Sequence, residues 1–184
     1  MQREGEGLTD RARQFETVAM PHLDAAYNLA RWLVRDEHAA EDAVQESFLR
    51  ALRYFDSFRG DAAKPWLLGI VRNTCFDWLR DNRGAAATVQ FDEELDHAHD
   101  ATPSSPLDDP LELLAARELG ARLDRAIEAL PVVYREALIL REQEELSYAD
   151  IARIGGVPVG TVMSRLSRAR RLLRSALVAE RAVE

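Results

Sequence analysis

Apolar residues recur every three or four positions along two stretches of the chain, residues 15–83 and 111–182. This spacing is typical of amphipathic helices, and neither stretch shows the strict alternation that predicts β-strands. Between them, Gly84 interrupts the pattern, and a segment with three prolines and few large apolar residues follows. The pattern therefore predicts an all-α protein. We expect a tail at 1–14, a small helical domain at 15–83, a flexible linker at 84–110 and a second helical domain at 111–184.

The clearest amphipathic helix of the first domain is predicted over His38–Phe55. Its core face would hold Val44, Phe48, Ala51, Leu52 and Phe55, which share one sector of a helical projection. The opposite sector carries Asp42, Glu46 and Arg50, with Leu49 among them. This face is either an ordinary solvated surface or, because Leu49 stands among charges, a surface for a partner.

A second helix is predicted over Trp66–Arg80, directly after Pro65. One of its sides is apolar, whereas the other carries Trp66, Asn73, Phe76 and Arg80. Aromatic rings, an amide and an arginine together suit unstacked bases, which stack on rings and bond to polar groups. The alternative is that both rings simply pack on a neighbouring helix, and composition alone favours that alternative.

The most specific local pattern is a helix-turn-helix at residues 146–171. Ser147 is placed to cap a short helix, with Asp150 three residues later, and Gly155, Gly156 and Val157 would form the turn. Pro158 suits the first position of the second helix, where a missing N–H costs nothing. On that helix, four residues share an anchoring face, namely Val162, Leu166, Ala169 and Leu173. Others point away from it and are placed to enter a DNA major groove, namely Ser164, Ser167, Arg168 and Arg171. A helical hairpin that does not bind DNA is the alternative.

Net charge first argues against nucleic acid as a partner, because the 184 residues sum to −8 at pH 7. The distribution changes this interpretation. Residues 88–118 hold nine acidic side chains and one arginine, which accounts for the whole net charge, while residues 158–184 hold six arginines and two glutamates. A neutral body, an acidic linker and a basic C-terminal helix indicate separate tasks along the chain.

Several function classes find no support in the sequence. No apolar run approaches a membrane span, and the polar N-terminus lacks a secretory signal, so we expect a cytoplasmic protein without membrane contact of its own. Cys75 is the one cysteine, which excludes disulfides and cysteine-rich zinc sites. His97 and His99 lie in the acidic linker, where solvation is favoured over metal binding. With neither a phosphate-binding loop nor a catalytic constellation, we expect no enzyme activity, cofactor or metal.

The segments together resemble bacterial sigma factors of the extracytoplasmic-function (ECF) group of the sigma-70 family. The matching stretches in the first domain are residues 40–48 (AEDAVQESF), 58–60 (FRG) and 66–73 (WLLGIVRN). In the second domain they are Leu130-Pro131, Arg135-Glu136, residues 146–148 (LSY) and residues 157–165 (VPVGTVMSR). The resemblance covers nearly all of the chain except the linker and the ends.

This resemblance implies the partners and the task. Such proteins bind the β and β′ subunits of core RNA polymerase, recognise the −10 and −35 promoter elements, help to melt the DNA, and are often held by an anti-sigma factor. The acidic linker would thread toward the active-site cleft of the polymerase. By the same resemblance, the surface for the β′ coiled coil consists of Asp42, Gln45, Glu46 and Leu49.

The resemblance also implies two sets of DNA-binding residues. The −10 element would meet Lys64, Trp66, Arg72, Asn73, Phe76 and Arg80, with Asn73 near the pocket for a flipped base. The −35 element would meet Thr161, Ser164, Arg165, Ser167, Arg168 and Arg171. Two positions depart from the family pattern. Lys64-Pro65 stand where polar residues without proline are usual, and Met163 stands where Lys or Arg is common.

Two other functions remain open at this point. A stand-alone helix-turn-helix regulator would bind duplex DNA without polymerase and would not need the surface at Asp42–Leu49. A sigma mimic that sequesters an anti-sigma protein would keep the helical surfaces and lose base-reading residues, yet Asn73, Arg168 and Arg171 are all present.

Overall fold

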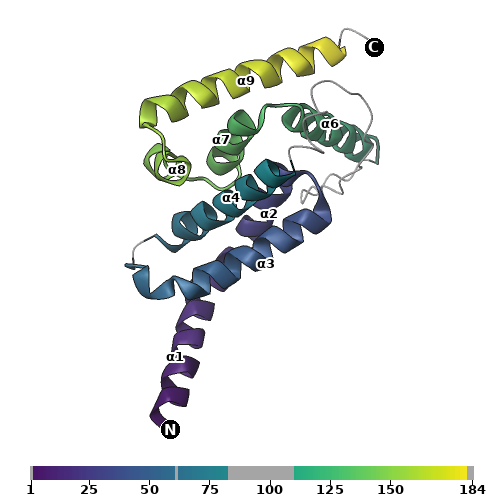
Figure 1. Ribbon diagram of the computed structural model, residues 1–184. Helices are drawn as coiled ribbons and strands as arrows, with labels where there is room; N and C mark the ends of the chain where they lie inside the picture. The colour runs from purple at the N-terminus through teal and green to yellow at the C-terminus, as the bar shows by residue number, and fades with distance from the viewer. Residues whose placement is uncertain (1, 61, 83–109, 182–184) are drawn as a thin grey trace.

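The computed structural model describes residues 2–60, 62–82 and 110–181, and every regular element in these ranges is helical (Figure 1). We call residues 2–82 the N-terminal half. It contains α1 (Gln2–Ala19), α2 (Leu23–Val34), α3 (Glu37–Arg53) and α4 (Ala63–Asp81), with short 3-10 turns at Met20–His22 and Phe55–Ser57. We call residues 110–181 the C-terminal half, which contains α6 (Pro110–Glu128), α7 (Val132–Glu142), α8 (Tyr148–Gly155) and α9 (Val159–Arg181). The all-α prediction is confirmed. The acidic run after Gly84, with His97 and His99, lies outside the described residues.

Helix α1 begins at Gln2, where the sequence predicted a tail, and its first turns project from the N-terminal half in Figure 1. Its last turns are anchored by apolar contact and by hydrogen bonds. The ring of Phe15 meets the rings of Phe48 and Phe55 edge-on, at centroid distances of 6.3 and 5.4 Å. Arg11 donates to Asp56 Oδ1 at 3.0 Å and to the Leu52 carbonyl oxygen at 2.9 Å. The first residues of α1 are polar and include glycine, so their intrinsic helix propensity is low. The contacts of Phe15 and Arg11 with the rest of the N-terminal half therefore help to stabilise this helix.

The two helices that carry the N-terminal candidate residues start earlier than predicted. Asp36 caps α3, because its carboxylate accepts a hydrogen bond from the Ala39 N–H at 2.7 Å. Helix α4 starts at Ala63, so Pro65 lies inside its first turn instead of before it. The first turn of a helix tolerates proline because the N–H groups there have no partner within the helix. The N–H of Trp66 then donates to the Ala62 carbonyl at 3.1 Å.

The helix-turn-helix forms from the local signals that the sequence shows. Ser147 Oγ accepts a hydrogen bond from the Asp150 N–H at 3.1 Å and so caps α8. Gly156 ends α8 with a φ of 61°, in the left-handed region where glycine carries no Cβ penalty. Pro158 lies just before α9, and its carbonyl accepts from the Thr161 N–H at 2.9 Å. The predicted anchor of α9 is buried at Val162, Leu166 and Ala169, each at most 1% exposed.

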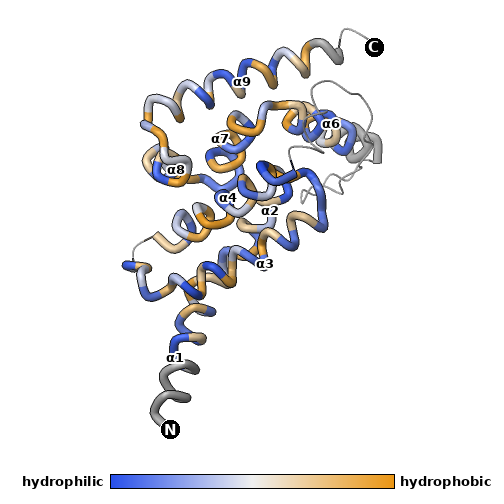
Figure 2. The backbone as a smooth tube through the Cα atoms, viewed as in Figure 1, coloured by the Kyte–Doolittle hydropathy of each residue, from blue (hydrophilic) through white to orange (hydrophobic). Residues whose placement is uncertain are grey.

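The two halves pack against each other, which the sequence did not predict. Helix α2 contacts α7, and α4 contacts α8. Buried residues of both halves form one continuous apolar cluster, which includes Leu33 and Val71 from the first half and Leu138 and Ile154 from the second. In Figure 2, hydrophobic and hydrophilic positions alternate along α3 and α9, as expected for helices with one buried side. The fold therefore buries one face of α3 and one face of α9 and leaves the opposite face of each exposed.

Candidate nucleic-acid and polymerase interface

The outer face of α3 is exposed where the sequence predicted a partner surface. We call Asp42, Gln45, Glu46 and Leu49 the docking face; all four side chains are exposed, and Leu49 is 62% exposed. The opposite side of α3 is buried at Ala40, Val44 and Ala51. Glu46 accepts a hydrogen bond from Arg50 at 2.7 Å, and Arg50 also lies 3.4 Å from Asp77 of α4. The structure thus presents a large apolar side chain among carboxylates, a composition suited to a protein partner.

The six residues predicted to meet the −10 element all lie on α4, in different environments. The ring of Trp66 packs on Phe58 at a centroid distance of 4.8 Å and on Phe55 at 6.4 Å. Phe76 is partly buried, and the guanidinium carbon of Arg72 lies 4.2 Å from its ring centroid. Both rings therefore have packing partners within the protein, although Trp66 packs on the 3-10 turn and the segment after it and Phe76 packs beside Arg72 of its own helix.

Among the residues predicted to meet the −10 element, some polar side chains are exposed and others are bound to the C-terminal half. Asn73 and Arg80 are exposed; Arg80 pairs with Asp77 at 2.9 Å, and Asn73 accepts a hydrogen bond from Arg72 at 3.2 Å. Lys64 and Arg72 instead contact carboxylates of the C-terminal half. Lys64 Nζ lies 2.9 Å from Glu144 Oε2, and Arg72 Nε lies 2.6 Å from Glu136 Oε1. Two of the six side chains are thus engaged by the other half of the chain.

Three further residues add hydrogen bonds to this contact between the halves, and Arg35 lies 3.9 Å from Glu128 across it. Asn28 donates to Gln143 Oε1 at 2.8 Å and to Glu144 Oε1 at 2.7 Å. The indole N–H of Trp32 donates to the same Gln143 oxygen at 3.1 Å. Sequence reasoning missed all of these pairs, and it had no signal for them, because the partners are separated by more than 60 residues. The one visible hint is the adjacent charged pair Arg135-Glu136 within a helix that is otherwise apolar on its buried side.

The outer face of α9 presents the residues predicted to meet the −35 element. Ser164, Ser167, Arg168 and Arg171 are exposed, while Thr161 and Arg165 are half-buried. Arg168 lies 3.3 Å from the Tyr134 hydroxyl, to which it donates. The structure therefore places this whole set on one accessible helix that is anchored from below, the geometry of a recognition helix.

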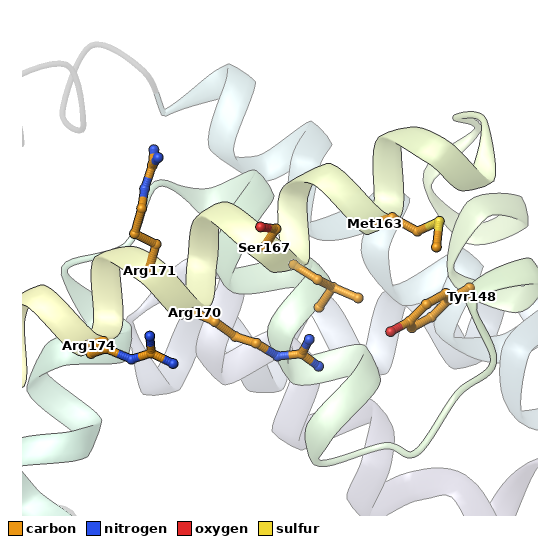
Figure 3. A pocket seen from close by; sticks show the side chains of 7 residues that line it. Tyr148, Met163, Ser167, Arg170, Arg171 and Arg174 are labelled. Carbon is orange, nitrogen blue, oxygen red and sulfur yellow. The ribbon is translucent and has the colours of Figure 1, made fainter.

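A shallow hollow adjoins this face between α8 and α9 (Figure 3). Tyr148 of α8 and Met163 of α9 lie side by side at one end, and Arg174 lies toward the other. Arg170 also lines it and pairs with Glu142 at 2.5 Å, a hydrogen bond that raises the pKa of Arg170 above its ordinary value. The residues predicted from the sequence to meet the −35 element did not include Arg170 and Arg174. Met163, 54% exposed, gives this positive surface an apolar spot.

The residues that the structure describes were also compared with what metal binding, membrane insertion and thiol chemistry would require. Among residues 2–60, 62–82 and 110–181, no group of three or more potential metal ligands gathers. In the same ranges, no helix has the length and apolar character needed to cross a membrane. Cys75 is fully buried, and loss of solvation raises the pKa of its thiol to about 12. Such a thiol is a core residue and a poor nucleophile.

Comparison with known proteins matches both halves to one family. The family model for Sigma-70 region 2 matches residues 18–85, which include the docking face and the candidate residues of α4. The model for Sigma-70 region 4 matches residues 120–173, which include the helix-turn-helix. Each match falls on the half that carries the corresponding candidate surface.

Individual relatives extend over most of the chain. The RNA polymerase sigma-H factor of Pseudomonas aeruginosa is 36% identical over 172 residues, which cover 90% of this chain and 86% of that protein. The ECF RNA polymerase sigma factor SigE of Mycolicibacterium smegmatis is 33% identical over 163 residues, which cover 89% of this chain but only 61% of SigE. Among solved structures, the sigma factor RpoE of Bartonella quintana, in complex with the anti-sigma factor NepR, has a TM-score of 0.69 at 30% identity, covering 90% of this chain and 97% of that one. The chain therefore belongs to the extracytoplasmic-function sigma factors of the sigma-70 family.

Proposed function

We propose that this protein binds core RNA polymerase, recognises the −10 and −35 promoter elements and promotes DNA melting at the start of transcription. The observation that carries this proposal is the presence, on one chain, of an exposed partner surface on α3 and an exposed basic recognition helix, α9. A sigma factor needs both, because it must hold the polymerase and the promoter at once. Members of this family act as DNA-binding regulators, and we propose no catalytic activity for the chain itself.

The domain assignment follows from where these surfaces lie. Residues 15–83 would form the region that binds the polymerase and the −10 element, and residues 111–184 the region that binds the −35 element. The docking face would meet the β′ subunit through Leu49 and its surrounding carboxylates. Because these partners are polymerase and chromosomal DNA, the protein would act in the cytoplasm.

The −10 element would be recognised by the exposed side of α4. Asn73 is exposed, so its amide is available to an unstacked base, whereas Arg72 beside it is paired with Glu136 in this structure. Flipping a base costs a few kcal/mol, which stacking and hydrogen bonding at this site must recover. Trp66 and Phe76 support the site from within through their packing.

The −35 element would be recognised by α9 in the major groove. Arg168 and Arg171 can pair with guanine edges or with phosphates, and Ser164 and Ser167 are short enough to let the helix approach the groove floor. Arg174 extends the positive surface along the helix beyond the residues that the sequence indicated, and Arg170 lies beside it, paired with Glu142.

An anti-sigma factor is a further proposed partner. The Bartonella quintana RpoE structure was solved with its anti-sigma factor, and this chain matches that fold over 90% of its length. The surfaces that bind polymerase and DNA are the surfaces that such a regulator would need to cover.

The test is run-off transcription with core polymerase and a library of promoter fragments, with and without this protein. We expect transcripts from a subset of promoters that share two elements, and only when core polymerase and this protein are both present. Sequence-specific binding to duplex DNA without any polymerase-dependent transcript would instead favour a stand-alone regulator. If the protein neither supports transcription nor binds duplex DNA, and it binds an anti-sigma protein tightly, the result would favour a sigma mimic.

A further inference from the structure

The surface of α9 changes character along the helix. Its first two turns carry two exposed apolar side chains, Val159 at 43% and Met163 at 54% exposure. The exposed arginines begin later, at Arg168, and continue through Arg171 and Arg174. The helix therefore presents an apolar start and a cationic continuation to whatever it binds.

Met163 lies on a side of α9 that also carries residues predicted to meet the −35 element. Ser167 and Arg171 follow it by four and eight residues, so the three side chains lie in a row along the helix. All three line the hollow beside α8, and Arg174 extends the row by a further turn (Figure 3). A DNA groove that reaches Ser167 and Arg171 therefore also reaches Met163.

The position of Met163 along α9 favours contact with bases over contact with phosphates. The N-terminal residues of a recognition helix contact base edges in the major groove. Helices rise about 1.5 Å per residue, so Arg171 and Arg174 lie about 12 Å and about 16 Å further along the axis. The major groove is about 12 Å wide. The later arginines are therefore placed toward the backbone when Met163 is over the groove floor.

The polar side chains beside Met163 are poorly placed for hydrogen bonding to a base. The Ser164 hydroxyl donates to the Thr161 carbonyl within α9 at 2.9 Å. Arg165 is half-buried, and its Nη1 would lie 3.9 Å from a Cβ at Gly155, so the guanidinium extends toward the end of α8. At the start of this helix, apolar contact is therefore the mode of base recognition that the exposed side chains offer.

We propose that Met163 sets part of the −35 specificity by contacting the 5-methyl group of a thymine, with Val159 on the preceding turn covering the contact. This inference rests on the proposed function, because it assumes that α9 enters the major groove of the −35 element. Thymine is the one DNA base with an apolar group in that groove. The methionine side chain is unbranched and polarizable, so it can follow a methyl group across small shifts of the helix.

The charges around Met163 indicate DNA as the partner instead of an apolar protein surface. Arg171 and Arg174 lie in the same row, and Ser167 adds a polar group between them and Met163. A ligand that fits this row needs negative charge along most of its length and one apolar group near the start of the helix. Duplex DNA with a thymine at the matching position satisfies both requirements.

The test removes a single methyl group from the DNA. A promoter selected in the run-off library is synthesised with deoxyuridine in place of each −35 thymine in turn, which keeps the base pair and deletes the methyl. At one position, holoenzyme with the wild-type chain should bind about fourfold more weakly, the usual effect of one buried methyl. Holoenzyme with Met163→Ala should bind the unmodified promoter about fourfold more weakly and should not respond to deoxyuridine at that position.

Leu172→Ala is the matched control, because Leu172 is also exposed, at 39%, and lies nine residues from Met163 on the opposite side of α9. This variant should keep the wild-type response to deoxyuridine. The inference is overturned if no thymine position responds in wild type, or if Met163→Ala keeps the response. Weaker binding of Met163→Ala to core polymerase alone would assign the side chain to a protein contact and would also overturn it. Absence of any polymerase-dependent transcript from the library would instead contradict the proposed function, and the inference with it.

Discussion

Arg135 donates a hydrogen bond to the carbonyl oxygen of Leu130 at 3.1 Å, across the turn that Pro131 introduces between α6 and α7. The same nitrogen donates to the Glu128 carbonyl at 2.5 Å. The Glu128 carbonyl is the last of α6, and Leu130 lies in the turn that follows, so this single buried arginine ties the end of the helix to the turn. Burial lowers the pKa of Arg135 to about 10, which leaves it charged at neutral pH.

We expect Arg135→Ala to lower the free energy of unfolding by about 1–3 kcal/mol, because it removes the side chain that donates to the buried Leu130 carbonyl and to the partly buried Glu128 carbonyl. Urea denaturation followed by circular dichroism measures this change. Arg153→Ala is the control, since Arg153 is exposed and pairs with Asp150 at the surface. Its loss should cost less than about 1 kcal/mol. Similar losses in both variants would contradict the proposed role of Arg135.

Removal of the α8 cap should destabilise the helix-turn-helix. Ser147→Ala deletes the oxygen that accepts the Asp150 N–H, and loss of such a cap typically costs about 1 kcal/mol. Ser175→Ala is a suitable control, because that hydroxyl only donates to the Arg171 carbonyl within α9. Thermal unfolding of both variants compares them directly, and a smaller loss for Ser147→Ala than for Ser175→Ala would refute the assignment.

The docking face should dominate binding to core polymerase. Asp42→Ala with Glu46→Ala removes two charges from a contact where such losses cost about 2–5 kcal/mol, so the Kd for core polymerase should rise more than tenfold. Glu16→Ala with Asp24→Ala removes two exposed charges elsewhere in the N-terminal half and should leave the Kd unchanged. Fluorescence anisotropy with labelled protein measures both. Unchanged affinity of the first variant would rule out this surface.

Arg168 tests how the −35 element is recognised. If Arg168 pairs with a base, Arg168→Ala in the holoenzyme should cost about 1–3 kcal/mol and relax preference at one promoter position. If it meets only a phosphate, affinity should fall evenly across sequences, with a shallower salt dependence. Tyr134→Phe removes the hydroxyl to which Arg168 donates and should leave promoter preference intact. Wild-type binding by Arg168→Ala to every promoter variant would exclude both modes.

The acidic linker should weaken binding of free chain to DNA. Residues 92–109 contain seven acidic side chains, and their replacement by amides at constant length should strengthen promoter binding, most at low salt. Deletion of residues 89–109 should not increase transcription, because the chain must still span two promoter elements. A salt titration of promoter binding compares the neutralised chain with wild type, and superimposable curves would contradict the prediction.

Local chemistry explains which parts of the fold could be predicted. Ser147, Gly156 and Pro158 each act within a few residues of themselves, so the helix-turn-helix could be derived from the sequence with its cap and its turn. The two faces of α3 likewise follow from residue spacing alone. Helix α1 was missed because its first turns carry no apolar stripe, and the contacts of Phe15 and Arg11 that support it come from residues about 40 positions away.

The contact between the halves could not be predicted for the same reason. Helical periodicity shows that a helix has a buried face and does not show which helix covers it. Lys64 and Arg72 look like ordinary DNA-binding cations in the sequence, and only the folded chain shows Glu144 and Glu136 beside them. The candidate residues were therefore correctly placed on helices, while the state in which two of them are held was not foreseen.

The pair formed by Lys64 and Glu144 has a consequence for how this sequence diverges. Glu144 is held by two side chains of the N-terminal half, because Lys64 pairs with its carboxylate and Asn28 donates a hydrogen bond to it. Across related sequences, loss of the cation at position 64 should therefore be followed by drift at position 144, and a hydrophobic residue at 144 should coincide with a neutral one at 64. Covariation between these two positions, which lie 80 residues apart in the sequence, would therefore record the contact between the two halves.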